Sequence, residues 1–306
     1  MFAWYKYNMT ILVTTSQKEY ELLDSGEGEK LERFGDVVLA RPDPEVLWDK
    51  RKDEKVWDMA HAHFKSGERG AKWHTKKTFP SSWVCGVGDI SLSLKIGNNK
   101  HVGFFPEQIP QWQWMIEKIK DQKSKWKMEG KEREISVLNL FGYTGGATMA
   151  LAAAGAEVTH VDSSKAAITW AHENKKVSRL EEKTIRFMLD DVRKFVERDI
   201  KRGVTYDAIL MDPPVYGRGV KKQSKDHMWH IDEDFLPLLE KVVKLLSPDP
   251  LFVVVTGYAS EYSHLSYANA LAGSLPKAII ESGELALKEK DTERLLPAGI
   301  FARATF

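Results

Sequence analysis

The sequence predicts an α/β fold, in which a largely parallel sheet carries helices on both faces and follows a smaller β-rich domain. From residue 135 onward, apolar strand-like runs alternate with helical patterns, an order typical of a parallel sheet with crossover helices. The last two β runs, 278–287 and 298–305, have no helix between them, which indicates an antiparallel pair. With 306 residues, of which 42% are hydrophobic, the chain is long enough for this core and a second domain.

Residues 1–105 are predicted to form the N-terminal β-rich domain. Short β-like runs separated by turn residues give strand candidates at 11–15, 37–40, 83–87 and 90–96, and a short helix is expected within 44–62. Residues 106–134 are predicted to link the two domains. Apolar residues at helical spacing predict a helix over 106–128, and the charged segment 129–134 follows it.

Residues 135–306 are predicted to form the second domain, which holds the parallel sheet. Its expected strands before the closing pair are 135–140, 157–161, 184–189, 206–211 and 251–256. Its expected helices are 145–154, 164–175, 192–202, 232–246 and 261–272.

The first strand of this domain leads into a glycine-containing loop with Gly142, Gly145 and Gly146, and the next strand ends on Asp162. Glycine allows a sharp turn and a close approach of a ligand, and an acid that closes the next strand can bind a ribose diol. This pattern predicts a nucleoside-cofactor pocket. The glycine spacing does not fit the dinucleotide fingerprint, and two of the glycines could simply begin a helix. Asp162 could instead cap the following helix, although Ser163 and Ser164 can do so without it.

A second candidate segment follows the strand at 206–211. Asp212, Pro213 and Pro214 come directly after this apolar run, at the carboxyl edge of the sheet where ligands bind. The two prolines fix the backbone and leave carbonyl groups without local N–H competitors. This arrangement can hold an amine and present it to an electrophile. Tyr216 could stack on a flat base there, or it could pack on its own domain.

These residues carry a resemblance to the class I S-adenosylmethionine-dependent methyltransferases, in particular to the branch related to large-subunit ribosomal RNA methyltransferases. It rests on the segments 103–108, 139–146 and 212–214, together with Asp162, Asp190 and Asp191. The resemblance implies a Rossmann-like seven-stranded sheet and S-adenosyl-L-methionine as the cofactor. It implies cofactor binding by Gln108, Asn139, Phe141, Tyr143, Thr144, Gly145, Gly146, Asp162, Ser163, Asp190, Asp191 and Asp212. It implies an acceptor site at Asp212, Pro213, Pro214 and Tyr216.

Within that resemblance, Gly145 is expected to face the methionine part of the cofactor and Asp162 the ribose. Asp191 or its neighbour Asp190 is expected to lie by the adenine, although an acid at a helix N-terminus is also favoured by the helix dipole. The general form of the first motif has an acid and three alternating glycines. Here these positions hold Asn139, Phe141, Tyr143 and Gly145, so only the last glycine is kept. This pattern resembles the RNA-modifying branch more than the general form. The one cysteine, Cys85, lies far upstream, so methylation of carbon 5 of a pyrimidine by a thiolate is disfavoured.

The resulting hypothesis is a methyltransferase that acts on a nucleobase nitrogen in ribosomal or other structured RNA. Methylation of a protein or a small molecule is the enzymatic alternative, and a non-catalytic RNA-binding or assembly factor is the alternative of another class. A nicotinamide-dependent oxidoreductase is a more distant alternative.

The net charge is +1, so any basic surface for RNA must be local. Arg218, Lys221, Lys222 and Lys225 could contact phosphates or form a solvated face. His227 and His230 have no evident further ligands, so no metal site is predicted. A single cysteine suits a reducing compartment, and no apolar run approaches the roughly 18 residues that span a bilayer. We therefore expect a soluble, cytoplasmic protein with no membrane partner, while the oligomeric state stays open.

Overall fold

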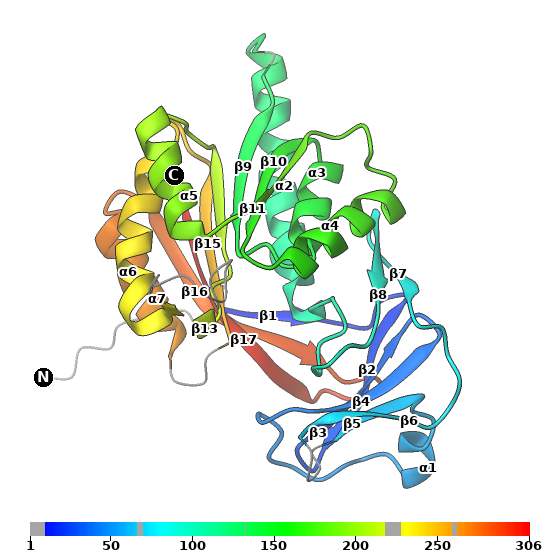
Figure 1. Cartoon of the computed structure of the whole chain (residues 1–306). Helices are drawn as coiled ribbons and strands as arrows, with labels where there is room; N and C mark the ends of the chain where they lie inside the picture. Colours follow the sequence, from blue (N-terminus) through cyan, green and yellow to red (C-terminus); the bar gives the residue numbers. More distant parts are fainter. Residues whose placement is uncertain (1–9, 66–69, 132, 218–227, 259–261) are drawn as a thin grey trace, which may run out of the picture.

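The apolar runs of the chain form one large, mostly parallel sheet (Figure 1). The computed structural model describes residues 10–65, 70–131, 133–217, 228–258 and 262–306. In spatial order the eight strands are β1 (Thr10–Thr14), β16 (Ile279–Lys288), β17 (Leu295–Thr305), β15 (Phe252–Gly257), β12 (Ala208–Met211), β9 (Ile135–Leu140), β10 (Ala156–Asp162) and β11 (Ile185–Leu189). The predicted α/β class is confirmed, and so is the antiparallel pairing of the last two strands, since β17 runs antiparallel to both β15 and β16.

Helices cover both faces of this sheet because its strands bury both sets of alternating side chains. In β9, Val137 packs into one hydrophobic cluster with α2 and α3, whereas Leu138 packs into the other with α5, α6 and α7. The helices are α2 (Ile109–Met128), α3 (Gly146–Ala153), α4 (Lys165–Val177), α5 (Val192–Arg202), α6 (Ile231–Val242) and α7 (His264–Ser274). Short 3-10 turns, η1 (Pro106–Gln108) and η2 (Val243–Leu245), precede α2 and follow α6. In the described part of the chain, no helix is both long and apolar enough to span a membrane.

The first strand, β1, joins the large sheet instead of the N-terminal domain, where it was expected. It adds an eighth strand to the seven predicted ones by pairing in parallel with β16, with Thr10 opposite Gly283. Gly283 permits this approach, since a Cβ there would overlap the Thr10 carbonyl oxygen. Thr14 fixes the other end of β1 because its hydroxyl donates to the Pro106 carbonyl at 2.9 Å. This pairing covers the edge that β16 would otherwise expose.

A separate five-stranded sheet forms from the N-terminal β runs. Its strands in spatial order are β2 (Tyr20–Gly26), β3 (Glu29–Phe34), β4 (Val37–Pro42), β5 (Ala62–Lys65) and β6 (Lys72–Thr75). Inside this sheet the Arg41 guanidinium pairs with the fully buried Glu32 carboxylate at 2.5 Å. The helix expected within 44–62 is reduced to one turn, α1 (Glu54–Trp57), because Leu47 faces solvent and only Trp57 is buried in that turn.

A hairpin of β7 (Trp83–Val87) and β8 (Ile90–Leu94) packs against α3 and α4 of the large body. The Ser93 amide donates to Asn174 Oδ1 at 2.8 Å, which fixes this contact. The hairpin and β1 therefore contact elements beyond residue 105. The division into 1–105, 106–134 and 135–306 stays a prediction.

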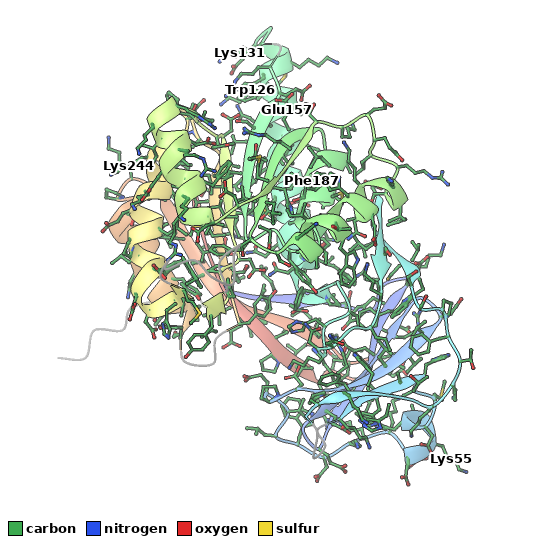
Figure 2. The ribbon with its side chains drawn as sticks, viewed as in Figure 1. Lys55, Trp126, Lys131, Glu157, Phe187 and Lys244 are labelled. Atoms are coloured by element: carbon green, nitrogen blue, oxygen red, sulfur yellow. The ribbon has the colours of Figure 1, made fainter. Side chains whose placement is uncertain are left out.

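The carboxyl ends of the parallel strands of the large sheet face the N-terminal sheet (Figure 1). Figure 2 shows Glu157, at the start of β10, on the side of the molecule away from that sheet, and Lys55 of α1 at the opposite end. Because parallel strands run in one direction, the loops that follow β9, β10, β12 and β15 lie at the edge between the two bodies.

The docking of β1 can be tested at Gly283. We expect Gly283→Ala to lower the free energy of unfolding by about 1–3 kcal/mol, since the added methyl group must displace Thr10. Hydrogen exchange at residues 10–14 should accelerate in this variant. Gly273→Ala is the matched control: it lies in α7 with open space around its Cβ and should raise stability by about 0.5–1 kcal/mol. Unchanged exchange at residues 10–14 in Gly283→Ala would contradict the strand pairing.

Candidate functional site

The loop after β9 adopts a tight and unusual backbone. Phe141 and Tyr143 have φ values of 60° and 50°, and Gly145 has a φ of 84°. Left-handed conformations at residues other than glycine are costly and tend to occur at functional sites. Gly142 is required between them, because a Cβ there would overlap the His160 ring. The loop can therefore bring its backbone close to a ligand at the carboxyl edge of the sheet.

Asp162, at the end of β10, fixes this loop. Its Oδ2 accepts a hydrogen bond from the Tyr143 amide at 2.9 Å, and its Oδ1 accepts one from the Ser164 amide at 2.7 Å. Ser164 itself caps α4 through the Ala167 amide, so the cap comes from a serine, as the sequence allowed. Each carboxylate oxygen retains a lone pair for a ligand. Burial raises the pKa of Asp162, and the two amide donors act in the opposite direction.

Asp212 directly follows β12, and within the described part of the chain its carboxyl group lacks a hydrogen bond at one of its two oxygens. Its Oδ1 is buried and has no hydrogen-bond partner among the described residues. Burial raises the pKa of Asp212 to about 6, and the Thr256 hydroxyl acts in the opposite direction. Since a buried polar atom without a partner is costly, this oxygen is available for a ligand hydrogen bond.

The two prolines after Asp212 differ in their surroundings. Pro213 is buried and Pro214 is exposed. The Pro214 carbonyl accepts a hydrogen bond from the Trp229 indole at 2.7 Å, so it is not free of N–H competitors as the sequence indicated. Beside the prolines, Asp212 Oδ1 is thus an acceptor without a partner among the described residues.

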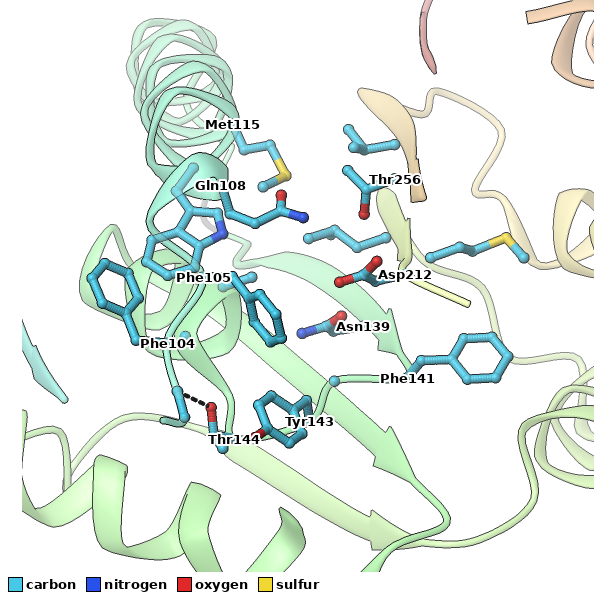
Figure 3. A pocket seen from close by; sticks show the side chains of 18 residues that line it. Phe104, Phe105, Gln108, Met115, Asn139, Phe141, Tyr143, Thr144, Asp212 and Thr256 are labelled. Carbon is cyan, nitrogen blue, oxygen red and sulfur yellow. Dashed lines mark hydrogen bonds between the residues drawn. The ribbon is translucent and has the colours of Figure 1, made fainter. Parts of the chain in front are cut away.

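Two cavities meet at this edge. The smaller one, of about 70 Å³, lies under the loop after β9, and Figure 3 shows Gln108, Asn139 and Asp212 around it, with the Phe105 ring among them. The larger one, of about 690 Å³, extends from the same loop to the N-terminal sheet. That volume is within the range of small-molecule and cofactor sites. Phe105, Tyr143 and Asp212 line both cavities, so the two form one continuous site.

Most of the predicted site residues come together here. Those that line one or both cavities are Gln108, Asn139, Phe141, Tyr143, Thr144, Gly146, Asp162, Ser163, Asp212, Pro213 and Pro214. Gly146 must remain small, because a Cβ would lie 2.6 Å from the Trp112 ring. Gly145, Asp190, Asp191 and Tyr216 line neither cavity.

The two acids after β11 have structural partners. Asp191 caps α5, where it accepts hydrogen bonds from the Arg193 amide at 2.9 Å and the Lys194 amide at 3.3 Å. It also pairs with the Arg193 guanidinium, and these interactions lower the pKa of Asp191 although burial opposes them. Asp190 accepts from the Asp191 amide and pairs with Arg198. An adenine contact by either acid stays a prediction.

Tyr216 does not line the site with the other acceptor residues. It lies in β13 (Tyr216–Gly217), which pairs with β14 (Trp229–His230), and its side chain is 69% exposed. Its ring packs edge-on against His230, with 4.6 Å between the centroids. The preceding residue, Val215, packs against the hydrophobic cluster under α6. The basic residues Arg218, Lys221, Lys222 and Lys225, and His227, lie outside the described residues.

Hydrogen bonds hold the segment 103–108 over the loop. Thr144 donates its hydroxyl proton to the Gly103 carbonyl at 2.7 Å, and the Thr144 carbonyl accepts from Asn174 at 2.8 Å. Beneath the loop, Asn139 donates to the Thr148 hydroxyl, which contacts His160 Nδ1 at 2.9 Å. Burial lowers the pKa of His160 to about 3, so this interior network carries no charge there at neutral pH.

The structure adds site residues that the sequence reasoning missed. Tyr258 and Tyr262 line the large cavity from the end of β15, and Lys30, Arg41 and Lys100 line it from the N-terminal sheet and its neighbouring loop. The rule that ligands bind at the carboxyl ends of strands could have indicated Tyr258. The basic residues meet the site through contacts between distant segments, for which the sequence carries no local signal.

Comparisons with known proteins point to one family. The family model described as RNA cap guanine-N2 methyltransferase matches residues 134–247. The chain is 36% identical over 119 residues to "Ribosomal RNA large subunit methyltransferase K/L" of Shewanella baltica, which covers 39% of this chain and 16% of that relative. This chain thus matches a small part of the relative's length.

Two solved structures illustrate matches over nearly the whole chain. A putative S-adenosylmethionine-dependent methyltransferase from Streptococcus mutans has a TM-score of 0.67 at 16% identity, covering 94% of this chain and 75% of that one, and shares the fold. An S-adenosylmethionine-dependent methyltransferase from Agrobacterium tumefaciens has a TM-score of 0.88 at 34% identity, and the match covers 97% of this chain and 93% of that one. This chain therefore belongs to the class I S-adenosylmethionine-dependent methyltransferases, as its resemblance to them implied.

Proposed function

We propose that this enzyme transfers a methyl group from S-adenosyl-L-methionine to a nucleobase nitrogen in structured RNA, with ribosomal RNA as the favoured substrate. The observation that carries the proposal is the buried Asp212 Oδ1, which has no partner among the described residues and lines the same site as the Asp162 loop. The RNA-directed descriptions of the matching family model and of the curated relatives support RNA as the substrate. A ribosomal substrate would place the enzyme in the cytoplasm.

The residues at the edge of the sheet fit the cofactor. Gly142 and Gly146 let the loop pack closely against the His160 and Trp112 rings, and the Asp162 carboxylate keeps acceptor capacity for a ribose diol. The loop from Gly142 to Gly146 would hold the methionine part. When bound, S-adenosyl-L-methionine supplies an electrophilic methyl carbon on a sulfonium.

Asp212 would orient the acceptor. Its carboxylate can accept the hydrogens of an exocyclic amine, which aligns the nitrogen lone pair for an in-line displacement and excludes competing water. After transfer, Asp212 can hold the proton that the nitrogen loses, because the raised pKa makes this carboxylate a better base than an exposed one.

The substrate class can be tested with labelled cofactor and total RNA. We expect label to enter material that ribonuclease degrades, and mass spectrometry of the nucleosides to identify a nitrogen-methylated base. A parallel reaction treated with ribonuclease before the enzyme is added is the control. Label that remains in protein after ribonuclease treatment would contradict the RNA substrate.

The ribose assignment can be tested by isothermal titration calorimetry on Asp162 variants. We expect Asp162→Ala to weaken cofactor binding by about tenfold or more, because it removes charge-assisted hydrogen bonds to the sugar. Asp162→Asn keeps an acceptor for the Tyr143 amide but removes the negative charge. Comparison of the two variants therefore distinguishes the effect of a disordered loop from the effect of the lost charge. If both variants bind the cofactor as tightly as the wild type, the ribose assignment is wrong.

The role of Asp212 predicts a pH dependence. Below its pKa of about 6 the carboxyl group is protonated and loses acceptor capacity, so kcat/KM should fall by about tenfold per pH unit below that value and level off above it. Asp212→Asn should lower kcat by about 100-fold and abolish this acidic limb. An unchanged limb in Asp212→Asn would assign the titration to another group.

A further inference from the structure

Tyr258 follows β15, which is the neighbour of the strand that leads into the proline pair, and all three residues line the large cavity. β12 and β15 are parallel neighbours with Met211 opposite Val255. When this register is continued, Asp212 lies beside Thr256, and Pro214 lies beside Tyr258. The Thr256 hydroxyl influences the pKa of Asp212, which agrees with this placement. Tyr258 also lines the large cavity, together with Asp212 and Pro214.

The Tyr258 side chain is held in place but not covered. Its hydroxyl oxygen accepts a hydrogen bond from Gln108 Nε2 at 2.6 Å, and its ring lies 5.5 Å from the Phe105 ring at an interplanar angle of 38°. Even so, 40% of the residue is exposed. Gly299 leaves room beside it, since a Cβ there would lie 3.4 Å from two ring carbons. A fixed ring with an exposed surface, facing a cavity, is suited to stacking.

The order of the strands places Tyr258 on the acceptor side of the site. Asp162 ends β10, the strongly turned loop follows β9, Asp212 follows β12, and Tyr258 follows β15, and these strands are neighbours in that order. Asp212 therefore lies between Asp162 and Tyr258. If Asp162 binds the sugar of the cofactor, the methyl acceptor lies toward Tyr258.

Of the other aromatic rings in the described residues, Phe105, Phe141 and Tyr143 also line the cavity with Asp212, and Phe141 and Tyr143 belong to the loop after β9. Tyr216 does not line the cavity, and its ring packs edge-on against His230. Tyr262 also lines the cavity, but its ring stacks on Tyr267, with 6.3 Å between the centroids, against the cluster under α6 and α7.

We propose that Tyr258 is the aromatic residue on which the acceptor base stacks, a specificity-determining contact that the sequence had assigned to Tyr216. This inference rests on the proposed function. Stacking on an aromatic ring is tolerant of base identity, so Tyr258 would select a flat acceptor, while Asp212 would select the atom that is methylated.

The experiment compares wild type, Tyr258→Leu, Tyr258→Phe and Tyr216→Leu by three measurements: the KM for RNA, kcat, and the Kd for S-adenosyl-L-methionine. Tyr258→Leu should raise the KM for RNA by about tenfold or more, because the stacking surface is lost. Its Kd for the cofactor should stay within about twofold of wild type, which a folding defect would not allow. Tyr258→Phe should restore the KM to within about threefold, since it keeps the ring.

A second measurement uses an RNA oligonucleotide with 2-aminopurine at the modified position and S-adenosylhomocysteine in place of the cofactor. Stacking on Tyr258 should quench its fluorescence in wild type and in Tyr258→Phe, and much less in Tyr258→Leu. If Tyr258→Leu keeps the wild-type KM and the wild-type quenching, the inference is wrong, although RNA methylation still stands. The same conclusion follows if the KM for RNA rises in Tyr216→Leu and not in Tyr258→Leu. A wild-type protein that neither binds nor methylates RNA would overturn both this inference and the proposed function.

Discussion

The geometry of the site depends on the two hydrogen bonds that the Asp162 carboxylate accepts. This carboxylate joins the end of β10 to the loop after β9 through the Tyr143 amide and to the start of α4 through the Ser164 amide. The loop it holds contains two residues other than glycine with positive φ, a conformation that persists only when its surroundings fix it. The carboxylate that would bind the sugar therefore also holds the loop that lines the pocket. Cofactor binding and the order of this loop are coupled through Asp162.

Asp212 lowers the stability of the fold. A buried acid with a raised pKa binds its proton more tightly in the folded than in the unfolded chain, so the stability of the fold decreases as the pH rises from about 4 toward 6. A buried oxygen without a partner in the described residues adds a further cost. The fold therefore retains Asp212 against its own stability, which is typical of a group that acts on a ligand.

The sequence was sufficient to predict the fold class and the alternation of strands and helices from residue 135 onward. Most of the predicted site residues line the two cavities, but their roles stay predictions. Helix α5 begins and ends at the predicted residues, because its apolar spacing, its Asp191 cap and its terminal Gly203 all agree. β1 was placed wrongly because its partner, β16, is more than 260 residues away, and no local pattern encodes that pairing. Tyr216 was expected at the acceptor because it follows the prolines, but it lies in the pair formed by β13 and β14 and lines neither cavity.

The side of the large cavity that the N-terminal sheet and its neighbouring loops line carries both positive and negative side chains. Two of its cations are paired with acids: Lys30 lies 3.0 Å from the Asp43 carboxylate, and Arg41 pairs with Glu32. A third, Lys100, donates to the Pro42 carbonyl at 3.3 Å. Glu45 and Glu284 add negative charge to the same lining. A phosphate would therefore gain little attraction inside the cavity, whereas a neutral base meets aromatic rings and hydrogen-bond acceptors there. An RNA acceptor would accordingly insert its base and leave its backbone outside, which agrees with a chain whose net charge is only +1.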